Sequence, residues 1–259
     1  MDLKKMMLRL RQCAEGKRRK RRRRRTMIYR CRLTWTKQRL LLALFVAGST
    51  ARAAARAAGV NRDTATRIFR LLREFIALER AAIAPFCGRA EIDECYLSGG
   101  VGGRKVAKRG VSLDGKFCVV GAAQREANSG LRRLRLKIIT RVNTETLTAF
   151  ARETIAPGAD VHTDQLSAYK LDAAGFRHFQ VNHHREFRNR DTGACTNLIE
   201  SAWSVLKRHF ARFCGGWRHN LHLFLREIEM RWELGADHFG SGLRALLEEN
   251  LRACRALNL

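Results

Sequence analysis

The sequence predicts an α/β protein, with a mixed five-stranded sheet flanked by helices and a small helical module before it. Three observations favour this fold class. Apolar residues recur with helical spacing over residues 36–80, short strand-like runs alternate with helices over residues 90–190, and helical spacing returns beyond residue 196. Because the strand-like runs are confined to the middle of the chain, a single sheet is expected there.

The composition indicates a polyanionic partner. Lysine and arginine total 51 against 24 aspartate and glutamate, which gives a net charge of +27 over 259 residues. Charge of this size concerns partners and not the fold, so DNA, RNA or an anionic membrane is indicated, and an arginine-rich compositional bias is the alternative. The longest apolar run, residues 40–47, is too short to cross a bilayer. We therefore expect nucleic acid and no membrane.

Residues 1–35 are expected to form a basic, disordered tail. The run GKRRKRRRRR at 16–25 repels itself and should bind phosphates without reading sequence. It would also act as a nuclear import signal, so the expected location is the nucleus in a eukaryote and otherwise the cytoplasm or nucleoid. A solvated tail is the alternative. The eight cysteines include no CxxC pair, so we expect reduced thiols and no structural zinc.

Residues 36–82 are expected to form a helix-turn-helix module. TKQRLLLALFVAG predicts a first helix, STARAAARAAG a second that ends at Gly59, and VNRDTATRIFRLLREFIALER a third. A short helix, a glycine-containing turn and a basic helix are typical of DNA-binding helix-turn-helix modules. A helical bundle without DNA contact is the alternative. The residues expected to face DNA are Arg62, Thr64, Thr66, Arg67 and Arg70.

The central section predicts five strands. EIDECYL, KFCVVGAAQ and LRRLRLKIIT are three strands, followed by a helix over 143–158, the strand ADVHTD, a short helix over 166–175, the strand FRHFQVNH and a helix over 196–213. This order, β-β-β-α-β-α-β-α, matches the ribonuclease H-like fold. Residues 236–259 are expected to form a C-terminal helix.

Three carboxylates far apart in sequence are expected to meet. Asp93 lies in the first strand, Asp164 ends the fourth, and Glu200 lies on the helix over 196–213. In a ribonuclease H-like sheet the first and fourth strands are neighbours and the late helix packs across their ends. Glu200 follows Ile199 of the apolar stripe, so it lies at the edge of the buried face.

Carboxylates that meet repel one another unless a cation compensates, and Mg²⁺ or Mn²⁺ prefers oxygen ligands. Two such ions about 4 Å apart would support phosphoryl transfer. Each acid has an ordinary alternative: Asp164 as a helix N-cap, Asp93 paired with an arginine, Glu200 as a surface acid. Glu91 and Glu94 compete for the role of Asp93, and strand alternation places Glu91 on its face and Glu94 on the other.

Several motifs then occur in a telling order: EIDECYLSGG, GRKVAKRG, VVGAAQR, VHTDQLSAY, VNH and TNLIESAWSVLKRHF. Together they resemble the transposase domain of ISXO-type insertion sequences, which is related to that of Merlin elements and belongs to the DDE transposase superfamily. The resemblance covers about residues 88–235 and includes FLREIEMRW. It implies metal-dependent DNA transposition by Asp93, Asp164 and a third residue. That residue is Asn or Glu before a Lys, so Glu200 with Lys207 fits best and Asn197 competes.

Two departures from the family stand out. Only Cys31 remains of the zinc ribbon that usually precedes the helix-turn-helix, and Cys195 replaces the histidine before the Thr-Asn pair. The copy could therefore be decayed. Trp203 and Trp232 lie in apolar helical stripes and are expected in the core. The basic residues expected at the DNA backbone near the acids are Arg104, Lys105, Lys108, Arg109, Lys207 and Arg208.

The sequence thus predicts a DDE-type transposase that cleaves double-stranded DNA and transfers strands, with a two-metal site of Mg²⁺ or Mn²⁺. A homodimer or higher oligomer on DNA is expected, because two element ends must meet in one complex. The alternatives are a catalytically inactive, transposon-derived DNA-binding protein and a ribonuclease H-like nuclease.

Overall fold

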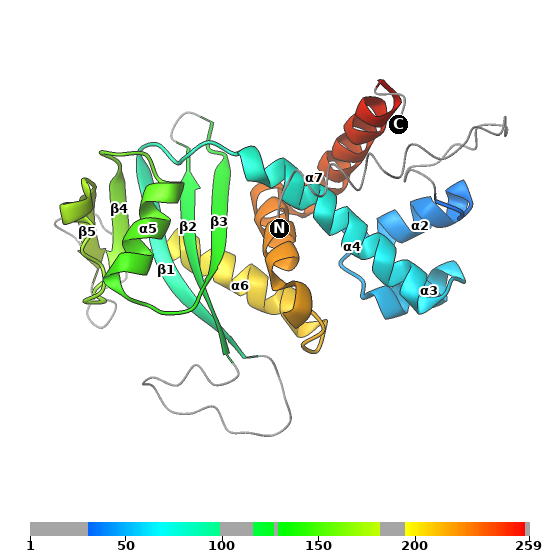
Figure 1. Ribbon diagram of the computed structural model, residues 1–259, viewed down its shortest axis with the longest axis horizontal. Helices are drawn as coiled ribbons and strands as arrows, with labels where there is room; N and C mark the ends of the chain where they lie inside the picture. Colours follow the sequence, from blue (N-terminus) through cyan, green and yellow to red (C-terminus); the bar gives the residue numbers. More distant parts are fainter. Residues whose placement is uncertain (1–30, 99–115, 127–128, 182–194, 257–259) are drawn as a thin grey trace. The chain divides into compact units, whose positions relative to one another are not determined.

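The computed structural model describes residues 31–98, 116–126, 129–181 and 195–256 (Figure 1). The chain divides into two compact units, residues 1–71 with 240–259 and residues 72–239. The basic run at 16–25 and the predicted contacts Arg104, Lys105, Lys108 and Arg109 lie outside the described residues.

The first unit is helical, as predicted for the section before the sheet. Thr50 caps α3, because its hydroxyl accepts from the backbone of Ala53 at 3.2 Å, and Gly59 ends that helix in the left-handed conformation with φ of 57°. The side chain of Asn61 accepts from the backbone of Asp63 at 2.7 Å and so serves the start of α4. The helices that begin the chain are α2 (Trp35–Val46), α3 (Ala51–Ala58) and α4 (Arg62–Glu79).

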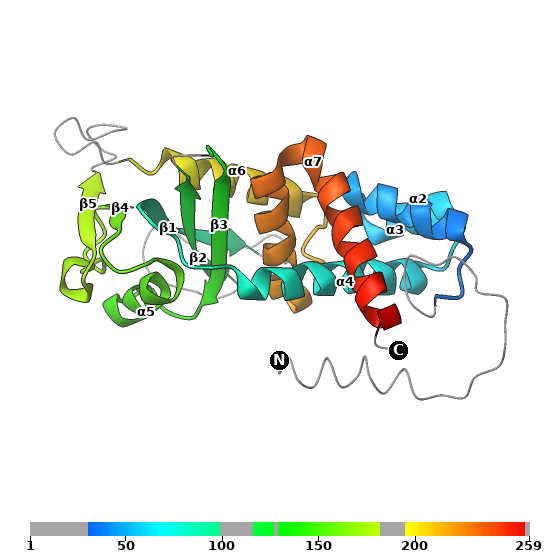
Figure 2. The same cartoon turned by 90° about the horizontal axis from the view of Figure 1, so that it is seen from above.

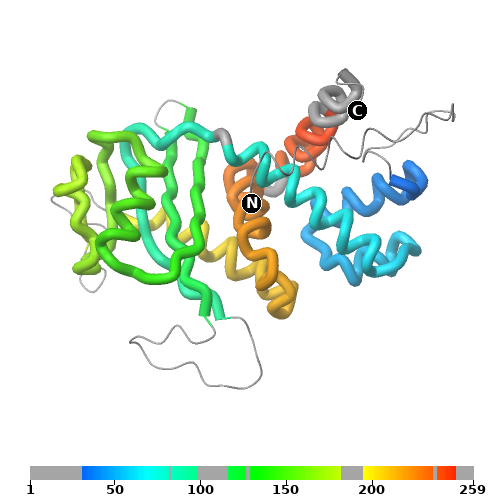
Figure 3. The backbone as a smooth tube through the Cα atoms, viewed as in Figure 1, coloured from blue at the N-terminus to red at the C-terminus, as the bar shows by residue number. Residues whose placement is uncertain are grey.

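The second unit contains a mixed five-stranded sheet in the order β3-β2-β1-β4-β5, which Figure 3 traces along the chain. β1 pairs antiparallel with β2 and β2 with β3, whereas β4 is parallel to β1 and β5 to β4. This topology confirms the predicted ribonuclease H-like sheet. The strands are β1 (Arg89–Ser98), β2 (Lys116–Arg125), β3 (Arg132–Ile139), β4 (Asp160–Asp164) and β5 (Arg177–Val181).

Helices cover both faces of this sheet (Figure 2). α5 (Thr144–Thr154) buries Leu147 and Phe150 in a core with Ile92 of β1. α6 (Asn197–Ala211) packs on the opposite face, in a core with Cys95 and Leu97 of β1. Alternate residues of β1 therefore belong to different cores, as strand geometry requires. The consequence for the site is that α6, and not α5, shares a face with Asp93.

The predicted helix over 166–175 is wrong. Only the 3-10 turn η2 (Asp172–Ala174) forms there. Tyr169 and Leu171 are both buried, and a spacing of two residues would place them on opposite sides of an α-helix. Burial of both side chains against the α5 face therefore holds this segment in turns.

The last helix, α7 (Leu221–Ala256), contains a break at Gly235, where φ is 70° and ψ is 176°. Before the break, two acids of α7 accept hydrogen bonds from the backbone of the edge strand β3. Glu229 accepts from the backbone of Leu136 and Glu233 from that of Leu134, both at 2.7 Å. An exposed edge strand is a template for pairing with other chains, and these carboxylates occupy its free N–H groups.

The acids of α7 are in turn paired with arginines. Arg80, just beyond α4 in η1 (Arg80–Ala82), donates to Glu229 at 2.8 Å and also to Glu233. Arg73 donates to Glu227 at 2.6 Å, and both side chains are buried. Some of the positive charge is therefore structural. η3 (Arg218–Asn220) precedes α7. Within the described residues, no helix is both long and apolar enough to span a membrane.

Candidate active site

The structure brings Asp93 within electrostatic range of the other two predicted acids, Asp164 and Glu200. Asp93 lies on β1, Asp164 ends β4, and Glu200 lies in the first turn of α6. Burial, and then the charges of Asp164 and Glu200, raise the pKa of Asp93 to about 6, although hydrogen bonds from Trp203 and the backbone lower it. Like charges therefore lie close together where β4 ends beside the middle of its parallel neighbour β1.

A divalent cation would relieve this repulsion, and the donor set fits it. Asp93, Asp164 and Glu200 offer carboxylate oxygens, which Mg²⁺ and Mn²⁺ prefer. In the part of the chain that the structure describes, no group of three or more His, Cys, Asp or Glu side chains is close enough to hold a metal ion. The three acids thus lie in one region, but their side chains are farther apart than ligands of a single metal ion would be.

Asp93 is held by a residue that sequence reasoning assigned only to the core. The indole nitrogen of Trp203 donates to Oδ2 of Asp93 at 2.8 Å. Trp203 is also a member of the α6-face core, with 5% of its surface exposed. Its position three residues after Glu200 indicates that the two side chains lie on neighbouring parts of one helix, but the sequence does not reveal the hydrogen bond to Asp93.

Glu91 ties the start of α6 to β1. Its Oε2 accepts from the backbone of Leu198 at 2.7 Å and of Ile199 at 3.1 Å. Thr196, the N-cap residue, makes no side-chain cap bond to the helix, so Glu91 provides the acceptor from another element. Burial raises the pKa of Glu91, while the hydrogen bonds to α6 lower it. Glu91 thus shares the face of Asp93 and serves to dock the helix.

Glu94 points to the other face of β1, as strand alternation predicts. It accepts a hydrogen bond from the hydroxyl of Tyr169. Burial raises the pKa of Glu94 to about 7, and the charges of Asp93 and Asp164 add to that rise. Burial also raises the pKa of Tyr169 well above its usual value, so the phenol stays protonated as the donor.

Asp164 also makes a local hydrogen bond. Its Oδ1 accepts from the backbone of Leu166 at 3.0 Å. No α-helix directly follows β4, so Asp164 is not a helix N-cap. The bond instead holds the turn after β4 and orients the carboxylate at the strand end.

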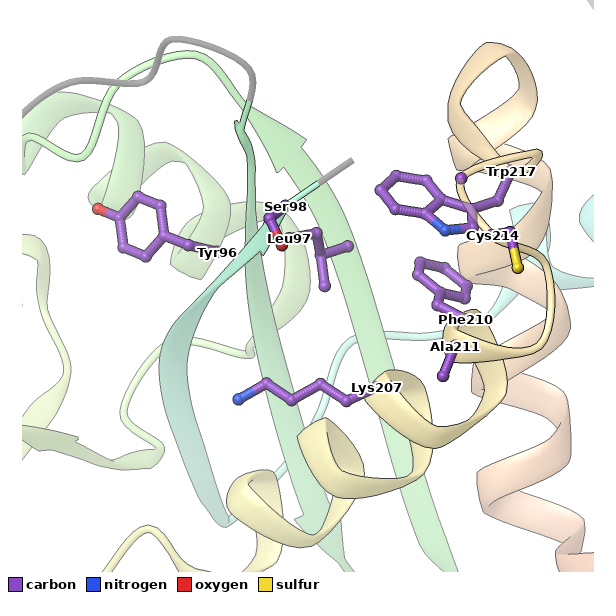
Figure 4. A pocket seen from close by; sticks show the side chains of 9 residues that line it. Tyr96, Leu97, Ser98, Lys207, Phe210, Ala211, Cys214 and Trp217 are labelled. Atoms are coloured by element: carbon purple, nitrogen blue, oxygen red, sulfur yellow. The ribbon is translucent and has the colours of Figure 1, made fainter. Parts of the chain in front are cut away.

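The remaining predicted residues lie along the outer side of α6. Asn197 begins the helix and is exposed, and Glu200 is exposed one turn later, where its Oε1 accepts from the hydroxyl of Thr196 at 3.1 Å. Lys207 is exposed two turns further on and extends from α6 toward β1 (Figure 4). Its charge lowers the pKa of the Cys95 thiol, which burial raises to about 11. Lys207 therefore lies near the β1 segment that carries Asp93.

A cavity of about 420 Å³ opens beside Lys207. Phe210 and Trp217 form one wall and stack on each other, with ring centroids 4.9 Å apart. Tyr96 borders the cavity, but Figure 4 shows its ring pointing away from that wall. The other lining residues are Leu97, Ser98, Ala211, Cys214 and Gly215. The cavity therefore lies next to Lys207, the lysine of α6 that is predicted to contact phosphate near the acids.

The predicted DNA contacts of α4 lie on its outer side. Arg62, Arg67 and Arg70 are exposed, and Thr64 is half-buried. Ile68 and Phe69 are buried on the opposite side, where Phe69 meets Phe45 of α2 edge to face at 5.1 Å between ring centroids. Arg208 is exposed on α6.

The strand order defines the class of protein, an α/β protein with a ribonuclease H-like sheet, and the comparisons with known proteins give the family. Residues 85–233, more than half of the chain, match the model of the ISXO2-like transposase domain. The chain therefore belongs to the ISXO2-like transposase family. It is 32% identical over 96 residues to an uncharacterized transposase-like protein of Haemophilus influenzae, a match that covers 37% of this chain and 76% of that protein.

Two solved structures show a remote likeness. The crystal structure of the Mos1 strand transfer complex is 9% identical with a TM-score of 0.31, covering 98% of this chain and 85% of that one. The Mos1 transposase paired-end complex with the left transposon end is 10% identical with a TM-score of 0.26, covering 93% and 88%. The fold assignment rests on the strand order and not on these superpositions.

Proposed function

We propose that the protein is a DDE-type transposase that cleaves DNA and transfers strands by metal-dependent phosphoryl transfer. The observation that carries the proposal is that the charges of Asp164 and Glu200 raise the pKa of Asp93, although the three acids belong to three separate elements. Membership of the transposase family supplies the reaction class.

Asp93, Asp164 and Glu200 would hold the metal, and Asn197 is the competing third ligand one turn earlier on α6. Bound Mg²⁺ or Mn²⁺ would supply an activated water or 3′-hydroxyl and would stabilise the leaving oxygen. Water would attack the phosphorus at the element end, and the P–O3′ bond would break. The released 3′-hydroxyl would then attack a phosphate of target DNA, whose own P–O3′ bond breaks and leaves a 3′-hydroxyl on the target strand. Lys207 would contact a phosphate oxygen beside the reacting one.

Double-stranded DNA is the proposed partner, bound by a homodimer or higher oligomer. The proposed organisation is a basic tail over 1–35, a helix-turn-helix over 36–82, a catalytic domain over 88–235 and a C-terminal helix over 236–259. Exposed arginines on α4 support the second of these assignments. The contacts proposed on described elements are Arg62, Thr64, Arg67, Arg70, Lys207 and Arg208.

The test is cleavage of a plasmid that carries the genomic sequence flanking the gene, with Mg²⁺, Mn²⁺ or EDTA. Asp164→Asn is expected to lower metal-dependent nicking by more than the roughly 100-fold typical of residues that only support a ligand. Arg125→Gln, at the far end of β2, is the control. It also removes one charge from the sheet-containing unit, but at a position away from the three acids. Circular dichroism reports whether each variant folds.

The products separate the proposal from its alternatives. Fragments joined to a second plasmid support transposition, and nicking without joining supports a nuclease of the same fold. Binding that weakens with salt, without nicking by the unaltered protein, would overturn the catalytic proposal and support a DNA-binding protein.

A further inference from the structure

Trp203 makes a hydrogen bond that packing alone does not require. Its ring lies in the core between α6 and the sheet, and its indole N–H donates to Oδ2 of Asp93 at 2.8 Å. A buried indole N–H needs an acceptor, and most find a carbonyl or hydroxyl. Here the acceptor is a carboxylate of the proposed active site, and bonds to charged acceptors are the stronger ones.

The sheet is shaped to admit this ring. Gly121 of β2 is the residue directly paired with Asp93. A Cβ atom at Gly121 would lie 2.6 Å from Cη2 and 2.9 Å from Cζ2 of Trp203, and 2.9 Å from Cδ2 of Leu136. Real side chains do not approach so closely, so the indole occupies the space that any other residue at 121 would fill. Gly121 and Trp203 together place the N–H beside Asp93.

The bond fixes one oxygen of Asp93. A free carboxylate turns readily about its last torsion, because that torsion has no sharp minima. With Oδ2 held by the indole, the orientation of Oδ1 is fixed as well. Trp203 and Glu200 belong to the same helix, so the bond also fixes how that helix lies relative to the carboxylate on β1.

We infer that Trp203, whose ring fills the space that Gly121 leaves open, is a positioning residue that sets the orientation of the Asp93 carboxylate for metal binding. The inference rests on the proposed metal site. Residues that hydrogen-bond a ligating carboxylate typically change metal affinity by about 10–100-fold when they are replaced.

The test is Mn²⁺ binding to the purified chain without DNA. Titration calorimetry and the rise in Tm that Mn²⁺ causes both measure the binding. Trp203→Phe keeps an aromatic ring in the core and removes the N–H. Trp232→Phe is the matched control, because Trp232 is buried in the same core and its ring contacts Arg132, 4.9 Å from the ring centroid. Trp203→Phe is expected to weaken Mn²⁺ binding by about 10–100-fold, and Trp232→Phe to leave it unchanged.

Gly121→Ala provides a second route that keeps Trp203. The added methyl must displace the indole, so Mn²⁺ binding is expected to weaken as in Trp203→Phe, and this variant decides the matter if Trp203→Phe does not fold. Affinity like that of the unaltered protein in either folded variant overturns the inference. If the unaltered protein and Asp164→Asn bind Mn²⁺ equally or not at all, the proposed metal site itself fails.

Discussion

The two faces of the sheet are built from the same strands but differ in what holds their helices. On the α5 face, the contact is an apolar core in which Ile92 meets Leu147 and Phe150. On the α6 face, apolar residues again form the core, but two carboxylates of β1 enter the contact. Glu91 accepts from the first turn of α6, and Asp93 accepts from Trp203. Helix α5 is therefore held mainly by apolar packing, whereas α6 is also held by hydrogen bonds to carboxylates of β1. Glu94, on the α5 face, bonds Tyr169 and not α5.

The difference teaches where stability and function separate. An apolar contact gains free energy from every buried group. A buried carboxylate costs free energy unless its partners compensate, and Asp93 faces Asp164 and Glu200 as well as Trp203. Such a cost is characteristic of sites that are shaped for a ligand. Changes at the carboxylates of the α6 face should therefore trade activity against stability, and changes in the apolar core under α5 should not.

The largest expected effect is that of Asp93→Asn. Removing the charge should lower metal-dependent nicking by more than the roughly 100-fold of a supporting residue. The same change should raise the stability of the metal-free protein at pH 8, because the pKa of Asp93 is raised from 3.8 to about 6. The gain is up to about 3 kcal/mol, measured by urea unfolding.

Ile92→Val, on the opposite face of the same strand, is the control for this trade. Deleting one buried methyl group should cost about 1 kcal/mol and leave nicking unchanged. If Asp93→Asn destabilises the metal-free protein as Ile92→Val does, the picture of a strained acid on the α6 face is wrong.

The next effect concerns pH. The pKa values of Asp93 and Glu94 are raised to about 6 and about 7, from 3.8 and 4.5. Both groups bind protons more tightly in the folded chain, so the stability they contribute is fully present below about pH 4 and lost as pH rises through 6 and 7. The Tm of the metal-free protein should fall over that window, and saturating Mn²⁺ should reduce the fall.

Asp93→Asn with Glu94→Gln should flatten the metal-free profile, as followed by differential scanning calorimetry across pH 5 to 8 in buffers near ~0.1 M ionic strength. A profile that keeps its slope in this double variant would assign the pH dependence to other groups.

Much of the fold was accessible from the sequence because periodicity reports burial. The five strands were predicted from short apolar runs bounded by turns, α6 was predicted from an apolar stripe at helical spacing, and the strand order followed from the order of elements. The segment over 166–175 was missed because its helix-like composition is overruled by Tyr169 and Leu171, two residues apart and both buried. Tertiary burial of that kind is not visible in local spacing.

The site was accessible only in part, for a physical reason. Acids can be assigned to predicted elements, so Asp93 and Asp164 on neighbouring strands and Glu200 on the late helix were identified as candidates. Hydrogen bonds between distant elements cannot be assigned in this way. Glu91 bonds Leu198 across 107 positions, and Trp203 bonds Asp93 across 110. The role of Gly121 likewise depends on a ring from another element.

The smallest expected effect comes from removing the side chains that accept hydrogen bonds from the first turns of α6 and α5. Glu91→Ala leaves the N–H groups of Leu198 and Ile199 without their acceptor, at a cost of about 2 kcal/mol. Asn143→Ala removes the bond of 2.9 Å that Asn143 accepts from Thr146 at the start of α5, at about 1 kcal/mol. Urea unfolding measures both. Only Glu91→Ala should also slow nicking, by about 10-fold, because the first turn of α6 carries Glu200. Equal nicking by both variants would mean that the start of α6 does not need Glu91 to place that acid, and the two faces would then differ in charge alone.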